Sequence, residues 1–241
     1  MSPQRRTPAL PDDEICHRLQ KATFDYFLVK TNRQNGLVVD KTAKNWPASI
    51  AAIGLALSAF PVGVERRLIG RKEAAARIRT TLELFWNAPQ GESPDATGYR
   101  GFFFFHFLDM ETGRRAWHSE LSTVDSGFLI AGALAAAAYF DGNEDGERRI
   151  RDLGRRIYER ADWEWASNGG PTLMHGWKPE VGFLPFRWQG YNEALLPSVP
   201  APGSPTHPVP PAAHPPWPQP HPRKTPPRPA YLPPAPPPSP P

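Results

Sequence analysis

The chain has 241 residues, with 28 lysines and arginines against 24 acidic residues, and its formal net charge is +4. Arg223, Lys224 and Arg228 lie in a C-terminal tail without acids, so the rest of the chain is nearly neutral. This balance excludes the basic surface expected of a nucleic-acid-binding domain. A single cysteine, Cys16, excludes an internal disulfide and a cysteine metal cluster, so neither a metal nor another cofactor is predicted. No apolar run is long enough to span a membrane.

Proline divides the chain into two parts, because 22 of its 32 prolines fall in residues 197–241. Proline lacks an amide donor and fixes φ, so that segment can form neither a helix nor a sheet ladder. We therefore predict a flexible N-terminus over 1–11, a globular domain over 12–196, and a disordered or polyproline II tail over 197–241. The P-x-x-P patterns of the tail would suit a partner that reads polyproline II, although proline-rich composition also produces them by chance.

The N-terminal residues do not look like a secretory signal, because no apolar segment follows Arg5 and Arg6. A cytoplasmic location is the default expectation, and a periplasmic one applies if the true start lies upstream.

The first half of the domain predicts three helices. Acids at 12–14 suit a helix N-terminus, and the helix should end before the turn at Asn35 and Gly36. Ser49 begins a helix that is apolar on nearly all sides, typical of a buried helix, and that we expect to end at Pro61. The segment 71–87 has one apolar side and one charged side, which predicts an outer, amphipathic helix.

The stretch 97–129 combines a run of aromatic residues with a histidine and several acids. Residues 101–108 are rich in β-formers and precede a turn-like segment, which favours a short hairpin. Ser122 can cap a helix over 123–140 in which Asp125 is the third residue. That helix is again almost wholly apolar, and an amphipathic helix over 147–161 follows it.

The last part of the domain, 173–196, is aromatic and not helical in pattern. A further helix should start at Asn192, and Pro197 interrupts it within two turns. Buried small-residue helices thus alternate with amphipathic ones, which is typical of an all-α, α/α toroid with short hairpins in its loops. A simple bundle would show one apolar stripe on each helix instead.

Two interpretations of the polar residues in 97–129 remain open. A histidine, acids and a tryptophan ahead of a small-residue helix are typical of a carbohydrate site. The same residues could instead belong to a buried hairpin and cap the next helix. Asp40 and Trp46 could also line a cleft, or form a solvated loop with a packed tryptophan.

Three blocks carry a resemblance to a known family: GFFFFHFLDMETGRRAWHSELSTVD, DWEWA, and GFLPFRWQGYNEALL followed by GSPTHP. They resemble the glycoamylase-like domain of bacterial β-1,2-glucanases (glycoside hydrolase family 144) and of cyclic β-1,2-glucan synthases. The similarity runs from about Cys16 to Leu196. It implies an (α/α)6 toroid with a glucan or oligosaccharide cleft, and inverting hydrolysis by two carboxyl groups roughly 6.5–9.5 Å apart.

Residue by residue, the resemblance implies that Glu193, in GYNEALL, is the general acid, or else a solvated first-turn glutamate favoured by the helix dipole. Glu120 and Asp125 would position substrate or water, or simply cap the helix. The implied substrate-binding residues are Trp117, His106, Asp109, Trp177, Arg187, Trp188 and Tyr191.

The sequence departs from the family pattern after GSPTHP, where prolines replace the residues of further helices. About half of the twelve toroid helices can be placed, so an open half-ring with exposed apolar inner-helix surface is expected. A second catalytic carboxylate that belongs to the other half would be absent. The alternatives to a β-glucan hydrolase are therefore an inactive carbohydrate-binding or scaffold protein, or a truncated fragment without function.

Overall fold

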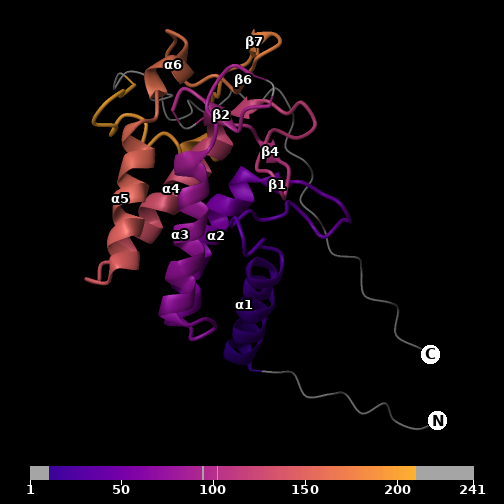
Figure 1. Ribbon diagram of the computed structural model, residues 1–241, viewed down its shortest axis with the longest axis vertical. Coiled ribbons are helices and arrows are strands. Elements are labelled where there is room, and N and C mark those ends of the chain that lie inside the picture. The colour runs from indigo at the N-terminus through magenta and orange to yellow at the C-terminus, as the bar shows by residue number, and fades with distance from the viewer. Residues whose placement is uncertain (1–10, 94, 102, 191, 210–241) are drawn as a thin grey trace, which may run out of the picture.

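A computed structural model describes residues 11–209, except residues 94, 102 and 191 (Figure 1). The helices are α1 (Asp12–Val29), α2 (Ile50–Glu65), α3 (Arg71–Asn87), α4 (Thr123–Tyr139), α5 (Asp145–Glu159) and α6 (Trp163–Ser167), with a 3-10 turn η1 (Glu193–Leu195). The strands are β1 (Ala48–Ser49), β2 (Gly98–Tyr99), β3 (Phe103–Phe104), β4 (Phe107–Leu108), β5 (Leu121–Ser122), β6 (Gly176–Lys178) and β7 (Gly182–Phe183). No helix in the described part of the chain is long and apolar enough to cross a membrane.

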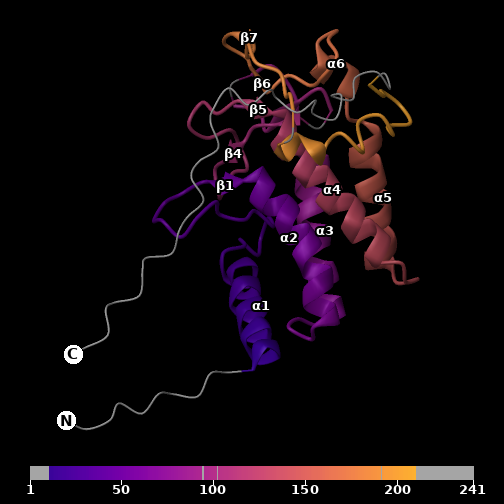
Figure 2. The ribbon, with the colours of Figure 1, turned by 180° about the vertical axis from the view of Figure 1, so that it is seen from behind.

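The predicted alternation of inner and outer helices is confirmed. The inner helices α2 and α4 pack against each other more extensively than any other pair, and the amphipathic helices α3 and α5 pack together outside them. On α5 the buried positions Ile150, Leu153 and Ile157 face this packing, while arginines occupy the rest of the surface. The large helices run side by side, and the short strands and α6 gather at one end of them (Figures 1 and 2).

Glycines allow the two inner helices to approach closely. A Cβ built on Gly54 of α2 would lie 2.3 Å from the carbonyl oxygen of Phe128, and one on Gly132 of α4 would lie 2.2 Å from the carbonyl oxygen of Gly54. Real side-chain carbons do not approach backbone oxygen so closely. Backbone therefore packs on backbone here, which fixes α2 and α4 relative to each other.

Each inner helix begins directly after a short strand at the same end of the molecule. β1 leads into α2 and pairs with β4, with Ser49 opposite Phe107. β5 leads into α4 and pairs with β6, which continues to β7. Phe104, at the end of β3, and Phe105 after it are fully buried. The loops before the inner helices are thus joined by backbone pairing.

Of two local predictions, one was wrong and one was confirmed. Pro61 does not end α2, which continues to Glu65 because proline removes only one backbone bond and the flanking Phe60 and Gly63 are buried against the core. The predicted hairpin forms around the turn after Leu108, because Leu108 bridges Arg115 and the Ala116 amide donates to the Phe107 carbonyl at 2.9 Å, while β3 pairs back to β2 and β4 also pairs with β1. Long-range pairing competes with local pairing here, and a single sequence does not show it.

The apolar face of α2 is not buried on every side. Leu55 and Val62 are 50% and 53% exposed. This agrees with the expectation that an incomplete ring leaves inner-helix surface open.

Residues 197–209 pack on the domain, although the sequence predicted that the tail begins at Pro197. Pro197 lies against Gly127 of α4, and the Tyr158 hydroxyl donates a 2.8 Å hydrogen bond to the Pro200 carbonyl. Ala201 and Val209 are buried in the core. Apolar side chains between the prolines supply this packing, which proline content alone does not reveal. The predicted N-terminal segment 1–10 and the tail from 210 lie outside the described residues.

The glycine contact yields a stability prediction. Gly54→Ala should lower the free energy of unfolding by about 1–3 kcal/mol, because the new methyl group overlaps the α4 backbone. Denaturant unfolding followed by circular dichroism measures the change.

Gly146→Ala is the matched control, because Gly146 is also helical but a Cβ built there would meet nothing within 4 Å. This variant should be neutral or gain up to about 1 kcal/mol through helix propensity. Equal effects of the two substitutions would contradict the close-packing interpretation.

Candidate functional site

His106 lies between the N-termini of the two inner helices. Its amide donates to the Glu120 carbonyl at 2.8 Å, and its own carbonyl accepts from the amide of Ile50, the first residue of α2, at 3.2 Å. These bonds tie the segment between β3 and β4 to both inner helices. The His106 side chain is therefore held by backbone that cannot shift independently.

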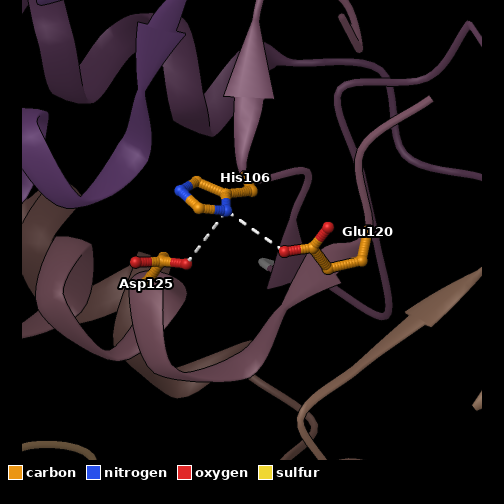
Figure 3. A group of neighbouring side chains, drawn as sticks. All are labelled: His106, Glu120 and Asp125. Atoms are coloured by element: carbon orange, nitrogen blue, oxygen red, sulfur yellow. Dashed lines mark hydrogen bonds and ion pairs between the residues drawn. The ribbon is translucent and has the colours of Figure 1, made fainter. Parts of the chain in front are cut away.

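Two carboxylates converge on the imidazole of His106 (Figure 3). Nδ1 lies 3.1 Å from Glu120 Oε1 and 3.5 Å from Asp125 Oδ2. Glu120 is the residue directly before β5, and Asp125 lies in the first turn of α4, so the two carboxylates approach the imidazole from different elements. We call His106, Glu120 and Asp125 the trio.

The trio is partly shielded from water, with side-chain exposures of 27%, 30% and 14%. Burial alone would lower the pKa of His106, but the hydrogen bond to Glu120 and the charges of Asp125, Glu120 and Asp40 outweigh it, so the pKa is raised. The hydrogen bond from His106 lowers the pKa of Glu120 against the opposing effect of burial. The site therefore favours an imidazolium paired with an ionised Glu120.

Asp125 also performs the capping role that the sequence predicted. The Ser122 hydroxyl accepts from the Asp125 amide at 3.3 Å and donates to Asp125 Oδ2 at 2.5 Å. Capping and membership of the trio are thus compatible, because the cap turns the carboxylate towards His106.

A row of aromatic rings extends from the trio at the end of the domain where the short strands gather. The His106 ring stacks on Phe107 at 4.0 Å, Phe107 lies 5.2 Å from Trp117, and Trp117 meets Trp46 edge-on at 4.7 Å. Trp117 is 55% exposed, and Trp46 donates a hydrogen bond to Asp40. The row ends in an exposed indole next to charged groups, which is suited to a sugar ring.

The remaining predicted binding residues serve local structure. Asp109 accepts from the Thr112 amide and hydroxyl, both at 2.8 Å, and these bonds lower its pKa. Arg187 donates to the carbonyls of Ser167, Thr172 and Asn168. Their polar atoms are therefore occupied within the protein.

The predicted tryptophans pack on the structure around the trio. Trp177 of β6 stacks on Tyr99 at 4.8 Å, and Trp188 donates to the hydroxyl of Thr123 at the start of α4. Trp188 also stacks on His175 at 4.1 Å. Tyr191 lies outside the described residues.

Glu193 is exposed on the short turn η1 and not on the longer helix that the sequence predicted. The Asn192 side chain caps this turn by accepting from the Ala194 amide at 2.9 Å. Among the described residues, no hydrogen bond or ion pair joins Glu193 to the trio. Its role as general acid stays a prediction.

Sequence reasoning named Asp40 as a possible cleft residue but missed Gly176. The charge of Asp40 helps to raise the pKa of His106, and Gly176 leaves room for the chain beside it, because a Cβ there would lie 2.7 Å from the Leu121 carbonyl oxygen and 3.1 Å from Glu120 Cγ. A glycine in a strand is a recognised sign of close approach. The ligand atoms of the trio lie within 4.8 Å of one another, so a metal ion could be accommodated, but their mutual hydrogen bonds already explain the arrangement.

Known proteins resemble the chain along most of its length. An exo-β-1,2-glucooligosaccharide sophorohydrolase of Parabacteroides distasonis is 24% identical over 199 residues, which are 79% of this chain and 26% of that protein. A candidate glucoamylase of Bacteroides fragilis is 26% identical, with a TM-score of 0.74 over 88% of this chain and 51% of that one. The endo-β-1,2-glucanase of Chitinophaga pinensis, solved with sophorotriose and glucose, has a TM-score of 0.75 at 24% identity, over 85% of this chain and 50% of that one.

No protein-family model matches the chain. The relatives nevertheless confirm the resemblance to glycoamylase-like proteins and the predicted partial α/α toroid. The chain spans about half the length of these solved structures and about a quarter of the sophorohydrolase.

The trio yields a titration prediction. Glu120→Gln should lower the pKa of His106, because the imidazolium loses its hydrogen-bonded anion while its burial remains. NMR titration of the His106 ring signals measures the shift. Glu111→Gln is the control, as it removes an exposed charge from the neighbouring loop. An unchanged His106 pKa in Glu120→Gln would show that the pair does not form.

The same pairing predicts how stability depends on pH. Because the pKa of His106 is raised on folding, its pairing stabilises the fold fully below the unfolded value near 6.5. This contribution is lost as pH rises through the folded pKa. The difference in melting temperature between wild type and His106→Gln should therefore shrink from pH 6 to pH 9. A difference that grows over this range would reverse the assigned sign.

Proposed function

We propose that the end of the domain at which the short strands gather binds β-glucan and forms part of a glycoside hydrolase active site. The proposal starts from the similarity of this chain to glycoamylase-like proteins. β-1,2-Glucan is the favoured substrate, since relatives named for β-1,2-linked glucans span most of this chain. The observation that carries the proposal is the trio beside exposed Trp117 at the N-termini of α2 and α4. Indole rings stack on the apolar faces of sugars, and carboxylates accept bonds from their hydroxyls.

The electrostatics of the trio favour particular roles within an inverting mechanism. That reaction needs one group to protonate the leaving oxygen and one carboxylate to activate water. The lowered pKa of Glu120 keeps it ionised at neutral pH, so it suits accepting a proton or a hydroxyl hydrogen bond and not donating one. His106, held protonated between the acids, suits donation to a sugar oxygen.

Glu193 is the proposed general acid, on the match of its block to the family. It precedes a segment that packs on α4, and Pro197 of that segment contacts Gly127. Its exposed position leaves it accessible to substrate. A bound sugar would exclude water from this carboxyl group, as proton donation to a leaving group requires.

The binding test compares two exposed aromatic residues. Calorimetric titration with β-1,2-linked gluco-oligosaccharides should show binding by wild type and about tenfold weaker binding by Trp117→Ala, as loss of roughly 1.4 kcal/mol of stacking implies. Phe186→Ala is the matched control. Phe186 is 63% exposed, similar to Trp117, but its ring lies against His175 and not in the aromatic row beside the trio. Its affinity should equal that of wild type.

Hydrolysis is assayed on the same proteins as release of reducing sugar from β-1,2-glucan. Glu193→Gln should abolish release while retaining oligosaccharide binding. Binding without release by wild type would favour a non-catalytic carbohydrate-binding protein. Absence of both binding and release would contradict the proposal.

A further inference from the structure

Arg115 is a cation with a buried side chain in the loop before β5, at 1% exposure. Its Nη1 and Nη2 donate to the two carboxylate oxygens of Glu180 at 2.5 and 3.1 Å. Its Nε donates to the Ser119 carbonyl at 2.6 Å, and Nη2 also donates to the His118 carbonyl at 2.9 Å. The guanidinium lies 4.5 Å from the centre of the Phe105 ring. Only an arginine presents donors in this planar fork.

The loop that Arg115 holds has an unfavourable backbone. Trp117 and His118 are consecutive non-glycine residues with φ of 56° and 51°. The left-handed region is disfavoured for L-residues and persists where the surroundings over-determine it. The two bonds from Arg115 hold the carbonyl of His118 in this turn and that of Ser119 directly after it, so they oppose its relaxation.

Glu120 is the second residue after this turn. The Ser119 hydroxyl accepts from the Phe107 amide at 3.2 Å and donates to its carbonyl at 3.3 Å, and the Glu120 carbonyl accepts from His106. The direction in which the Glu120 side chain leaves the backbone is therefore set by the turn that Arg115 stabilises.

Glu180 reaches Arg115 from the turn that joins β6 to β7. It lies between β6 and β7, and β6 pairs with β5 through Trp177 and Leu121. Arg115 holds the pKa of Glu180 down at about 2, so the pair is ionised throughout the neutral range. The ion pair thus joins the loop before Glu120 to the strands beside it.

We propose that Arg115 and Glu180 are positioning residues that hold Glu120 in place against His106. The effect of this positioning on sugar binding rests on the function proposed above. The placement of Glu120 against His106 does not depend on that function. An ordinary surface ion pair would contribute little beyond a small gain in stability. The buried fork and the left-handed turn distinguish this pair from such a contact.

The test measures the pKa of His106 by NMR at 0.15 M salt, because the hydrogen bond to Glu120 raises this pKa and its loss would lower it. His106 is faced by Glu120, Asp125 and Asp40, and of these only Glu120 lies within two residues of the turn at Trp117 and His118, whereas Asp125 is held by α4. Arg115→Lys keeps the charge but loses the fork, so it should lower the His106 pKa by at least half of the shift seen in Glu120→Gln. A purely Coulombic role of Arg115 predicts no shift in this variant.

Glu180→Ala and Glu180→Gln provide a second arm at a position that is 40% exposed, so the fold should tolerate them. Glu180→Ala should lower the His106 pKa, and Glu180→Gln should lower it less, because an amide oxygen still accepts from Arg115. Glu159→Ala is the matched control, since Glu159 pairs with Arg155 on α5 at 2.6 Å and is 32% exposed. The control should leave His106 unchanged.

An unchanged His106 pKa in Arg115→Lys and Glu180→Ala overturns the proposal, as does an equal shift in Glu159→Ala. Where wild type binds gluco-oligosaccharide, Glu180→Ala should bind about tenfold more weakly, the loss of roughly one charge-assisted hydrogen bond. Failure of wild type to bind sugar would count against the proposed function alone, because the titration needs no ligand.

Discussion

The close contact of α2 with α4 is the constraint on which the rest of the structure depends. Gly54 and Gly132 let the two backbones meet, which places the N-termini of both helices side by side. β1 and β5 precede these helices without a linker, so the segments that carry His106 and Glu120 converge on Asp125 in the first turn of α4. A larger residue at either glycine would separate the helices and, with them, the two sides of the site.

The balance between burial and pairing governs the chemistry at this convergence. Burial alone would favour neutral groups, yet His106 faces acids on several sides and donates to Glu120. The result is a charged, hydrogen-bonded cluster beside an exposed tryptophan. Such a cluster presents both donors and acceptors to a ligand rich in hydroxyls. The ionised Arg115–Glu180 pair adjoins this cluster through the loop before Glu120, where Arg115 donates to the carbonyls of His118 and Ser119.

The surface of the inner helices is open in one place and covered in another. Leu55 and Val62 leave apolar surface of α2 open. The opposite side of the inner layer is different, because residues 197–209 cover α4 and α5 with Pro197, Pro200 and the buried Ala201. Glu193 precedes this covering segment, on a single 3-10 turn.

The sequence by itself determined the features that depend on neighbouring residues. Helical periodicity located α3, α4 and α5 to within a few residues, and the Ser122–Asp125 spacing predicted the cap. The ordered blocks also identified the relatives and hence the toroid. These signals are local, since a helix and its cap are specified within a few turns.

Only the tertiary structure decided which polar residues meet. His106 and Glu120 are 14 residues apart, Arg115 and Glu180 are 65 apart, and no periodicity specifies either pair. The same limit explains why Asp109 and Arg187 were predicted as ligand groups, whereas the fold occupies them with Thr112 and with backbone carbonyls. The chemistry of a side chain follows from its type, but its partners depend on packing between distant segments, which here is set by the glycine contact of α2 and α4.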